Sequence, residues 1–132
     1  MRVFRRNAPV PTSTAELGRR GERAAARWLR RERYRILARN VRIPGGELDL
    51  VCCAPDRRTI VVVEVKTRIA GASGPPPEAN VGAEKRARLR RLAERLRRAN
   101  GWEDRPIRIE VIAVEWGANG RPSVRRFQSI GC

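Results

Sequence analysis

The spacing of apolar residues predicts two helices in this chain. The first runs from about residue 13 to residue 33 and begins with a capping-box pattern, Ser13 followed by Glu16 three residues on. The second runs over about 81–99, where leucines and alanines form a stripe, and ends at the stop signal Asn100-Gly101. Both patterns are typical of helices that bury one face.

The other periodic segments predict strands, and their order predicts an α/β sandwich. Alternating or continuous apolar runs predict strands over 34–43, 47–53, 59–67 and 107–116, with a short fifth over 123–127. Residues 71–77, with their glycines and prolines, are expected to form a loop, and 1–12 a flexible basic arm. The chain of 132 residues has the length of one domain, which we expect over 13–132.

Charge points to the partner. The chain carries 30 Lys and Arg against 14 Asp and Glu, a net charge of +16. Nucleic acid is the first partner that such an excess implies, and an acidic membrane surface the second. Neither helix combines a wide apolar face with flanking aromatic residues, and no apolar stretch approaches the roughly 18 residues of a membrane span. Nucleic acid is therefore favoured as the partner, and no membrane association is expected.

Composition also excludes several chemistries. Histidine is absent, which excludes Ser-His-Asp and Cys-His catalysis and His-ligated zinc. The three cysteines, Cys52, Cys53 and Cys132, fit neither a disulfide framework nor a CxxC metal site. No signal peptide is visible, so we expect a reducing cytoplasm. Arginine makes up all of the 30 basic residues except Lys66 and Lys85, whose ammonium groups have pKa values that their surroundings can shift.

The strand predicted over 59–67 carries two charges in an otherwise β-branched run. Such a run is typical of a strand covered on both faces, yet Glu64 and Lys66 share one of those faces. Burying a carboxylate costs several kcal/mol unless a cation compensates. The alternative is that both residues lie at the solvated end of the strand and have no role.

The preceding strand favours a role. If Ala54 pairs with Thr59 in a hairpin, Asp49 lies opposite Glu64 and Glu47 lies opposite Lys66. Directly opposed residues have Cβ atoms roughly 4.5–5.5 Å apart, and two carboxylates this close repel each other. Oxygen ligands from two strands suit a hard divalent ion such as Mg²⁺, and Lys66 would neutralise part of the charge.

Two further residues are candidates for the same site. Glu22 lies at the edge of the first helix's apolar stripe, where it either joins the site or pairs with Arg19 or Arg23. Lys85 projects into the apolar sector of the second helix. It either extends to solvent, or points at the carboxylates or at a phosphate.

These motifs resemble the YraN family of small bacterial endonuclease-like proteins. The resemblance rests on Gly21-Glu22, on GELDLV at 46–51 and on VEVKTR at 63–68, and it continues to about residue 116. YraN proteins are in turn similar to the PD-(D/E)xK nuclease superfamily, in particular to archaeal Holliday-junction resolvases. Here Leu48 stands where the superfamily motif has proline, and Glu110 stands where an aspartate is expected.

The resemblance implies the restriction-endonuclease-like fold, a central mixed β-sheet flanked by helices. It also implies site roles: Asp49 and Glu64 as ligands of Mg²⁺ (or Mn²⁺), with the Val65 carbonyl as a third. Lys66 would be the catalytic lysine and Glu22 an auxiliary acid.

The function expected is metal-dependent hydrolysis of phosphodiester bonds, with DNA favoured over RNA and structured or branched DNA favoured as substrate. Arg68 and Lys85 are the candidate substrate contacts. Junction resolution would suit a homodimer, although no interface is readable from the residues. The alternative is a nucleic-acid-binding protein without catalysis, in which Lys66 and Arg68 neutralise the acids internally.

Overall fold

The computed structural model describes residues 13–72 and 81–131, and its elements follow the predicted order. They are α1 (Thr14–Arg31), β1 (Arg35–Ile43), β2 (Gly46–Cys53), β3 (Ile60–Ile69), α2 (Ala83–Ala99), β4 (Ile107–Trp116) and β5 (Pro122–Gly131). β5 is longer than the short strand expected over 123–127. The expected arm, 1–12, and residues 73–77 of the expected loop lie outside the described residues.

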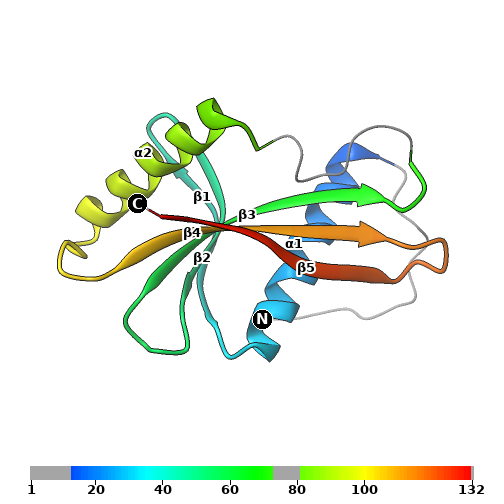
Figure 1. Ribbon diagram of the computed structural model, residues 1–132, viewed down its shortest axis with the longest axis horizontal. Helices are drawn as coiled ribbons and strands as arrows, with labels where there is room; N and C mark the ends of the chain where they lie inside the picture. The colour runs from blue at the N-terminus through cyan, green and yellow to red at the C-terminus, as the bar shows by residue number, and fades with distance from the viewer. Residues whose placement is uncertain (1–12, 73–80, 132) are drawn as a thin grey trace.

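Within the described residues, five strands form one mixed sheet in the order β1-β2-β3-β4-β5. Neighbouring strands are antiparallel except for β3 and β4, which are parallel and run side by side in Figure 1. Parallel neighbours need a crossover connection, and α2 lies in the segment that joins this pair. The fold class is α/β, as predicted.

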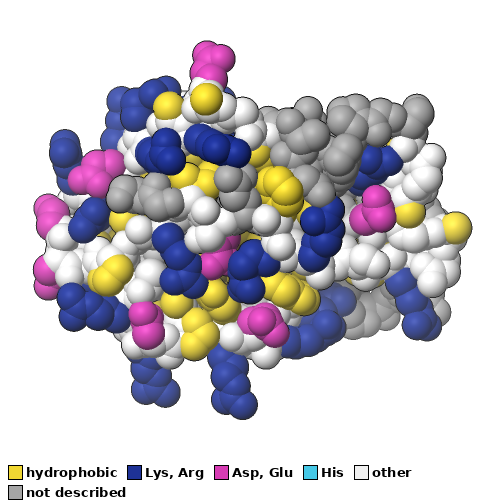
Figure 2. Space-filling model, viewed as in Figure 1, with side chains coloured by type: hydrophobic (Ala, Val, Ile, Leu, Met, Phe, Trp, Pro, Cys, Tyr) yellow, Lys and Arg dark blue, Asp and Glu magenta, His cyan; other side chains and the backbone are white. Residues whose placement is uncertain are grey.

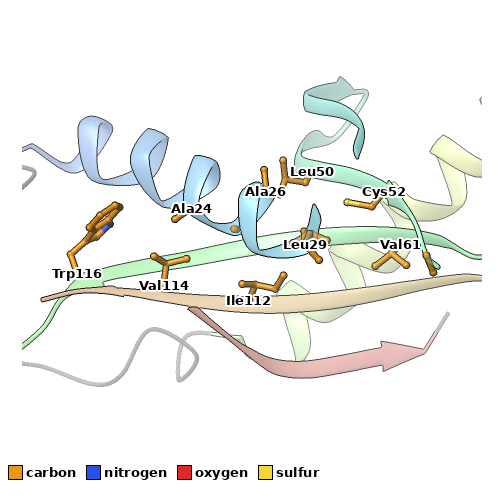
Figure 3. Close-up of a cluster of buried hydrophobic side chains, with 12 residues drawn as sticks. Ala24, Ala26, Leu29, Leu50, Cys52, Val61, Ile112, Val114 and Trp116 are labelled. Carbon is orange, nitrogen blue, oxygen red and sulfur yellow. The ribbon is translucent and has the colours of Figure 1, made fainter. Parts of the chain in front are cut away.

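Each helix covers one face of the sheet. On the α1 face, Ala24, Ala26 and Leu29 of the helix pack against sheet residues that include Leu50 and Ile112 (Figure 3). On the α2 face, a second cluster joins the helix to β2, β3 and β4; it includes Leu89, Leu92, Val62 and Val111. A mixed sheet between two helices is consistent with the nuclease-like fold that the resemblance implied.

A close helix–strand contact fixes where α1 crosses β3. Ser13 begins the helix as predicted, because its Oγ accepts the backbone N–H of Glu16 at 3.1 Å. Gly21 then lies so near β3 that a Cβ atom there would be 1.9 Å from Cγ2 of Thr67. The next residue is Glu22, so this contact brings the Glu22 side chain to the C-terminal half of β3.

Candidate active site

The β2–β3 hairpin has the predicted register but is shorter than predicted. Its ladder pairs Cys53 with Ile60 and continues to Leu50 with Val63, where it stops. The pairing expected between Asp49 and Glu64, and that between Glu47 and Lys66, is therefore not formed. β2 separates from β3 one position before the two acids would have become ladder partners.

Side-chain contacts nevertheless bring Asp49 to β3. Its Oδ2 accepts the backbone N–H of Val65 at 2.8 Å. The Asp49 carboxyl group is also close enough to Glu64 for the charge of Glu64 to raise the pKa of Asp49. In a regular ladder a β2 carbonyl would accept the Val65 N–H, so the Asp49 side chain replaces a missing strand contact. The sequence predicted that these two acids meet, and they do so through side chains.

Glu64 is a buried acid with two ammonium partners. Its residue is 7% exposed, which excludes the solvated strand end considered above. Its Oε2 lies 2.6 Å from Nζ of Lys85 and 3.4 Å from Nζ of Lys66. Lys85 lies in the first turn of α2. Of the alternatives that the sequence left open for Lys85, the structure shows the one in which its ammonium group points at the carboxylates.

The two lysines respond differently to this shared position. Burial and the hydrogen bond with Lys85 lower the pKa of Lys66, although Glu64 acts in the opposite direction. For Lys85, burial alone would lower the pKa, but the hydrogen bonds with Glu64 and Lys66 raise it. Lys85 is thus the firmly charged partner of Glu64, and Lys66 is the lysine whose proton is held less tightly.

The surroundings of Asp49 favour the protonated form of its carboxyl group. Burial, followed by the charge of Glu64, raises its pKa to about 7, and the hydrogen bond from Val65 opposes this only in part. Within the described ranges Asp49 forms no ion pair, whereas Glu64 forms two. The site therefore contains one neutralised carboxylate and, beside it, a carboxyl group without a cation.

Glu22 approaches from the α1 face. Burial and the charges of Glu47 and Glu64 raise its pKa, and Arg39 partly offsets them. Among the residues that the structure describes, Glu22 forms no ion pair with Arg19 or Arg23, the alternative that the sequence left open. Glu22 and Lys85 thus both interact with Glu64, from helices on opposite faces of the sheet.

Two other residues singled out from the sequence lie elsewhere. Nε of Arg68 is 3.5 Å from Oε2 of Glu115, so Arg68 does not neutralise Asp49 or Glu64. Glu110 is buried on β4 between Arg108 and Arg126, whose Nε atoms lie 2.8 and 2.7 Å from its carboxylate oxygens. This separate ion network has no part in the carboxylate pair.

The donor set at the site is small. Within residues 13–72 and 81–131, no group of three Cys, Asp or Glu side chains has the arrangement of a metal cluster. The side-chain donors are Asp49 and Glu64, and the backbone adds a third oxygen. The N–H and C=O of one strand residue point to the same side, so the carbonyl of Val65 faces the side on which Asp49 lies.

Basic side chains are numerous on the surface of the molecule. Figure 2 shows Lys and Arg side chains spread over the visible face, with Asp and Glu between them. No helix in the described part of the chain is long and apolar enough to cross a membrane.

Comparison with known proteins places these residues in a family. Residues 21–114 match the model of "Uncharacterised protein family UPF0102". The chain belongs to this UPF0102 (YraN) family. The UPF0102 match spans all six of the predicted site residues: Glu22, Asp49, Glu64, Lys66, Arg68 and Lys85.

Individual UPF0102 proteins match over most of their length. The chain is 46% identical to one from Beutenbergia cavernae over 115 residues, which are 87% of this chain and 95% of the relative. It is 46% identical to one from Symbiobacterium thermophilum over 113 residues, covering 86% and 93% of the two chains. A UPF0102 protein from Anaeromyxobacter dehalogenans is 43% identical over 111 residues, covering 84% and 80%.

Proposed function

We propose that this UPF0102 protein is a metal-dependent nuclease that hydrolyses phosphodiester bonds in nucleic acid. The observation that carries the proposal is the close pair of carboxyl groups, Asp49 and Glu64, at the point where β2 leaves β3. Glu64 already has cationic partners, but Asp49 forms no ion pair with a described residue. A divalent cation would supply the missing charge and allow Asp49 to ionise at neutral pH.

The chemistry of the donors favours Mg²⁺ or Mn²⁺. Two carboxylates and the Val65 carbonyl are hard oxygen ligands, which these ions prefer over nitrogen or sulfur. Asp49 and Glu64 would hold the ion by their side chains. When bound, it supplies Lewis-acid activation of the phosphate and of the attacking water.

The residues around the pair have separate tasks in this mechanism. Lys85 holds the Glu64 carboxylate in place through its 2.6 Å contact. Lys66 lies on the same strand face, and because its pKa is lowered it is suited to orient the attacking water or to stabilise charge on the phosphate. Glu22, whose pKa is raised, is positioned to accept or return a proton as an auxiliary acid.

The substrate follows from charge. A net charge of +16 supplies affinity for the phosphates of nucleic acid that does not depend on base sequence. We propose DNA over RNA, and structured or branched DNA in particular, with Arg68 and Lys85 as candidate contacts and a homodimer as the form that would resolve junctions. The cytoplasm remains the proposed compartment; Cys52 and Cys53 are free and buried.

One observation favours a second candidate function, a nucleic-acid-binding protein without catalysis. Two ammonium groups already neutralise Glu64, which reduces its need for a metal. The partners are Lys85 and Lys66, and not Arg68, which pairs with Glu115. In this alternative Asp49 stays protonated and serves only to accept the Val65 N–H.

A cleavage assay with matched variants separates the two functions. Asp49→Asn retains a hydrogen-bond acceptor for Val65 but loses the charge, so we expect it to abolish Mg²⁺-dependent cleavage of branched and single-stranded DNA while DNA binding stays almost intact. Asp104→Asn, at an exposed loop position, is the matched control and should cleave like the wild type.

The outcomes are distinct. Cleavage that survives Asp49→Asn would remove the site assignment. If the wild type cleaves nothing with Mg²⁺ or Mn²⁺, and a chelator changes neither binding nor stability, the binding-protein alternative is correct.

A further inference from the structure

A basic pocket lies at the opposite end of β2 and β3 from the carboxylates. Its volume is about 770 Å³, which falls within the usual range for small-molecule sites. Four arginines line it, Arg33, Arg35, Arg57 and Arg105, together with apolar residues that include Leu37 and Pro55. No lining residue is acidic, and none belongs to the candidate active site.

The positive charge of this arginine pocket is not neutralised within the described residues. None of its four arginines forms an ion pair with a carboxylate of residues 13–72 or 81–131. Arg105 is nevertheless held in position, because its Nε donates to the Arg58 carbonyl at 2.8 Å and its guanidinium lies 5.6 Å from the centre of the Trp102 ring. Four like charges around one pocket repel one another, and a bound anion would relieve this repulsion.

Backbone conformation gives an independent indication. Arg33 and Arg57 have φ values of 69° and 62°, and in the described part of the chain only Asn40 shares this feature among non-glycine residues. Arg33 directly follows the C-cap of α1, a position where glycine is usual. A side chain in this conformation costs stability, and such costs cluster at binding sites. The chain has arginine at both strained positions beside the pocket.

We propose that the arginine pocket binds the phosphate of a nucleotide. Guanidinium groups bind phosphate oxygens through paired, charge-assisted hydrogen bonds. Leu37 is one of two large hydrophobic residues exposed among the described residues, at 40%, and together with Pro55 it offers an apolar surface for the sugar or base. The phosphate comes either from a nucleic-acid strand or from a free nucleotide. This inference is independent of the nuclease proposal.

The double variant Arg33→Gly/Arg57→Gly tests the pocket. Glycine adopts the same φ values without strain, so the melting temperature should not fall, whereas two guanidinium groups are lost. Isothermal titration calorimetry without divalent metal, using pyrophosphate, a nucleoside monophosphate and short oligonucleotides, should show binding weakened about tenfold or more. Arg35→Gln, at an exposed strand position, should weaken binding in the same direction and provides a second variant if the first does not fold.

The matched control is Arg27→Gln/Arg91→Gln. It removes the same charge from exposed helix positions outside the pocket and should leave pyrophosphate and monophosphate affinity within about twofold of the wild type. If pocket and control variants weaken binding equally, or if neither does, the proposal is overturned. Such a result would assign the affinity to overall charge alone.

The ligands distinguish the two sources of phosphate. If removing a 5′-phosphate from the oligonucleotide weakens binding in the wild type but not in Arg33→Gly/Arg57→Gly, the pocket binds a strand end. If the variant loses affinity for pyrophosphate and the monophosphate but not for the oligonucleotides, the pocket binds a free nucleotide. The same titrations on Asp49→Asn should match the wild type, because Asp49 lies outside the pocket. A wild type that binds phosphate in the pocket but cleaves no nucleic acid would overturn only the nuclease proposal.

Discussion

The carboxylate of Asp49 accepts a 2.8 Å hydrogen bond from the backbone N–H of Val65. Strand pairing stops at Leu50 and Val63, so this contact continues the connection of β2 to β3 by a side chain. It also fixes Asp49 beside Glu64. The same acid therefore completes the hydrogen bonding of a strand and forms half of the candidate metal site.

Removing the acceptor should cost stability. At pH 5, where Asp49 is mainly protonated, Asp49→Ala leaves the Val65 N–H without its partner, and we expect the free energy of unfolding to fall by about 1–3 kcal/mol. Asp49→Asn should lose less, because its amide oxygen still accepts the bond. Urea denaturation of the two variants measures the difference, and equal losses would show that the hydrogen bond has no structural role.

Stability should fall as pH rises towards neutrality. The pKa of Asp49 is raised from its ordinary value of 3.8 to about 7. Between these values the folded state binds more protons than the unfolded state, so the stabilisation present below pH 3.8 is lost as pH rises through about 7. Between pH 5 and pH 8 the wild type should lose on the order of 2 kcal/mol more than Asp49→Asn. Parallel stability curves for the two proteins would contradict this assignment.

Metal affinity should show the opposite dependence on pH. A carboxyl ligand must be ionised, so binding of Mg²⁺ releases the Asp49 proton when pH is below its pKa of about 7. We expect affinity to be about tenfold higher at pH 8 than at pH 6, with proton release that calorimetry in buffers of different ionisation enthalpy detects. An affinity that does not change over this range would exclude Asp49 as a ligand.

The two lysines should differ in what their loss affects. Lys85→Met removes the closest cation from buried Glu64, so we expect a loss of about 1–3 kcal/mol in the free energy of unfolding. Lys66→Met should change stability less but reduce kcat by about 10²–10⁴-fold, because Lys66 acts on the water or the phosphate. Urea denaturation and steady-state kinetics measure both effects. Equal profiles for the two variants would refute separate roles.

The contact between α1 and β3 predicts opposite effects for two glycines of one helix. Gly21→Ala places a Cβ atom 1.9 Å from Cγ2 of Thr67, so we expect a loss of about 1–3 kcal/mol. A Cβ atom at Gly18 would meet nothing within 4 Å, and Gly18→Ala should stabilise the helix by up to about 1 kcal/mol. Thr67→Ser should partly rescue Gly21→Ala. Thermal unfolding gives the comparison, and a neutral Gly21→Ala would mean that the contact is loose.

The sequence was sufficient for the fold because local patterns determine it. The capping residue Ser13, the β-branched run of β3 and the stop at Asn100-Gly101 each act within a few residues. It also predicted that Asp49 and Glu64 meet. The mode of contact required the structure, since no spacing rule states that β2 leaves β3 at Leu50.

The sequence left other partners open for a similar reason. Lys85 had three alternatives on its helix, and only the packing of α2 against the sheet selects Glu64. The ion pair of Arg68 with Glu115 likewise depends on the parallel register of β3 and β4, in which these two residues are paired. The arginine pocket combines residues from three separate segments, 33–37, 53–57 and residue 105, so no single motif indicates it.

The central claim, that Asp49 and Glu64 together hold a divalent cation, is tested most directly by a crystal of the protein soaked in Mn²⁺. The claim predicts an anomalous peak between the two carboxylates and next to the Val65 carbonyl, lost in crystals of Asp49→Asn. A fully soaked crystal that shows no anomalous peak between these two carboxylates would contradict it.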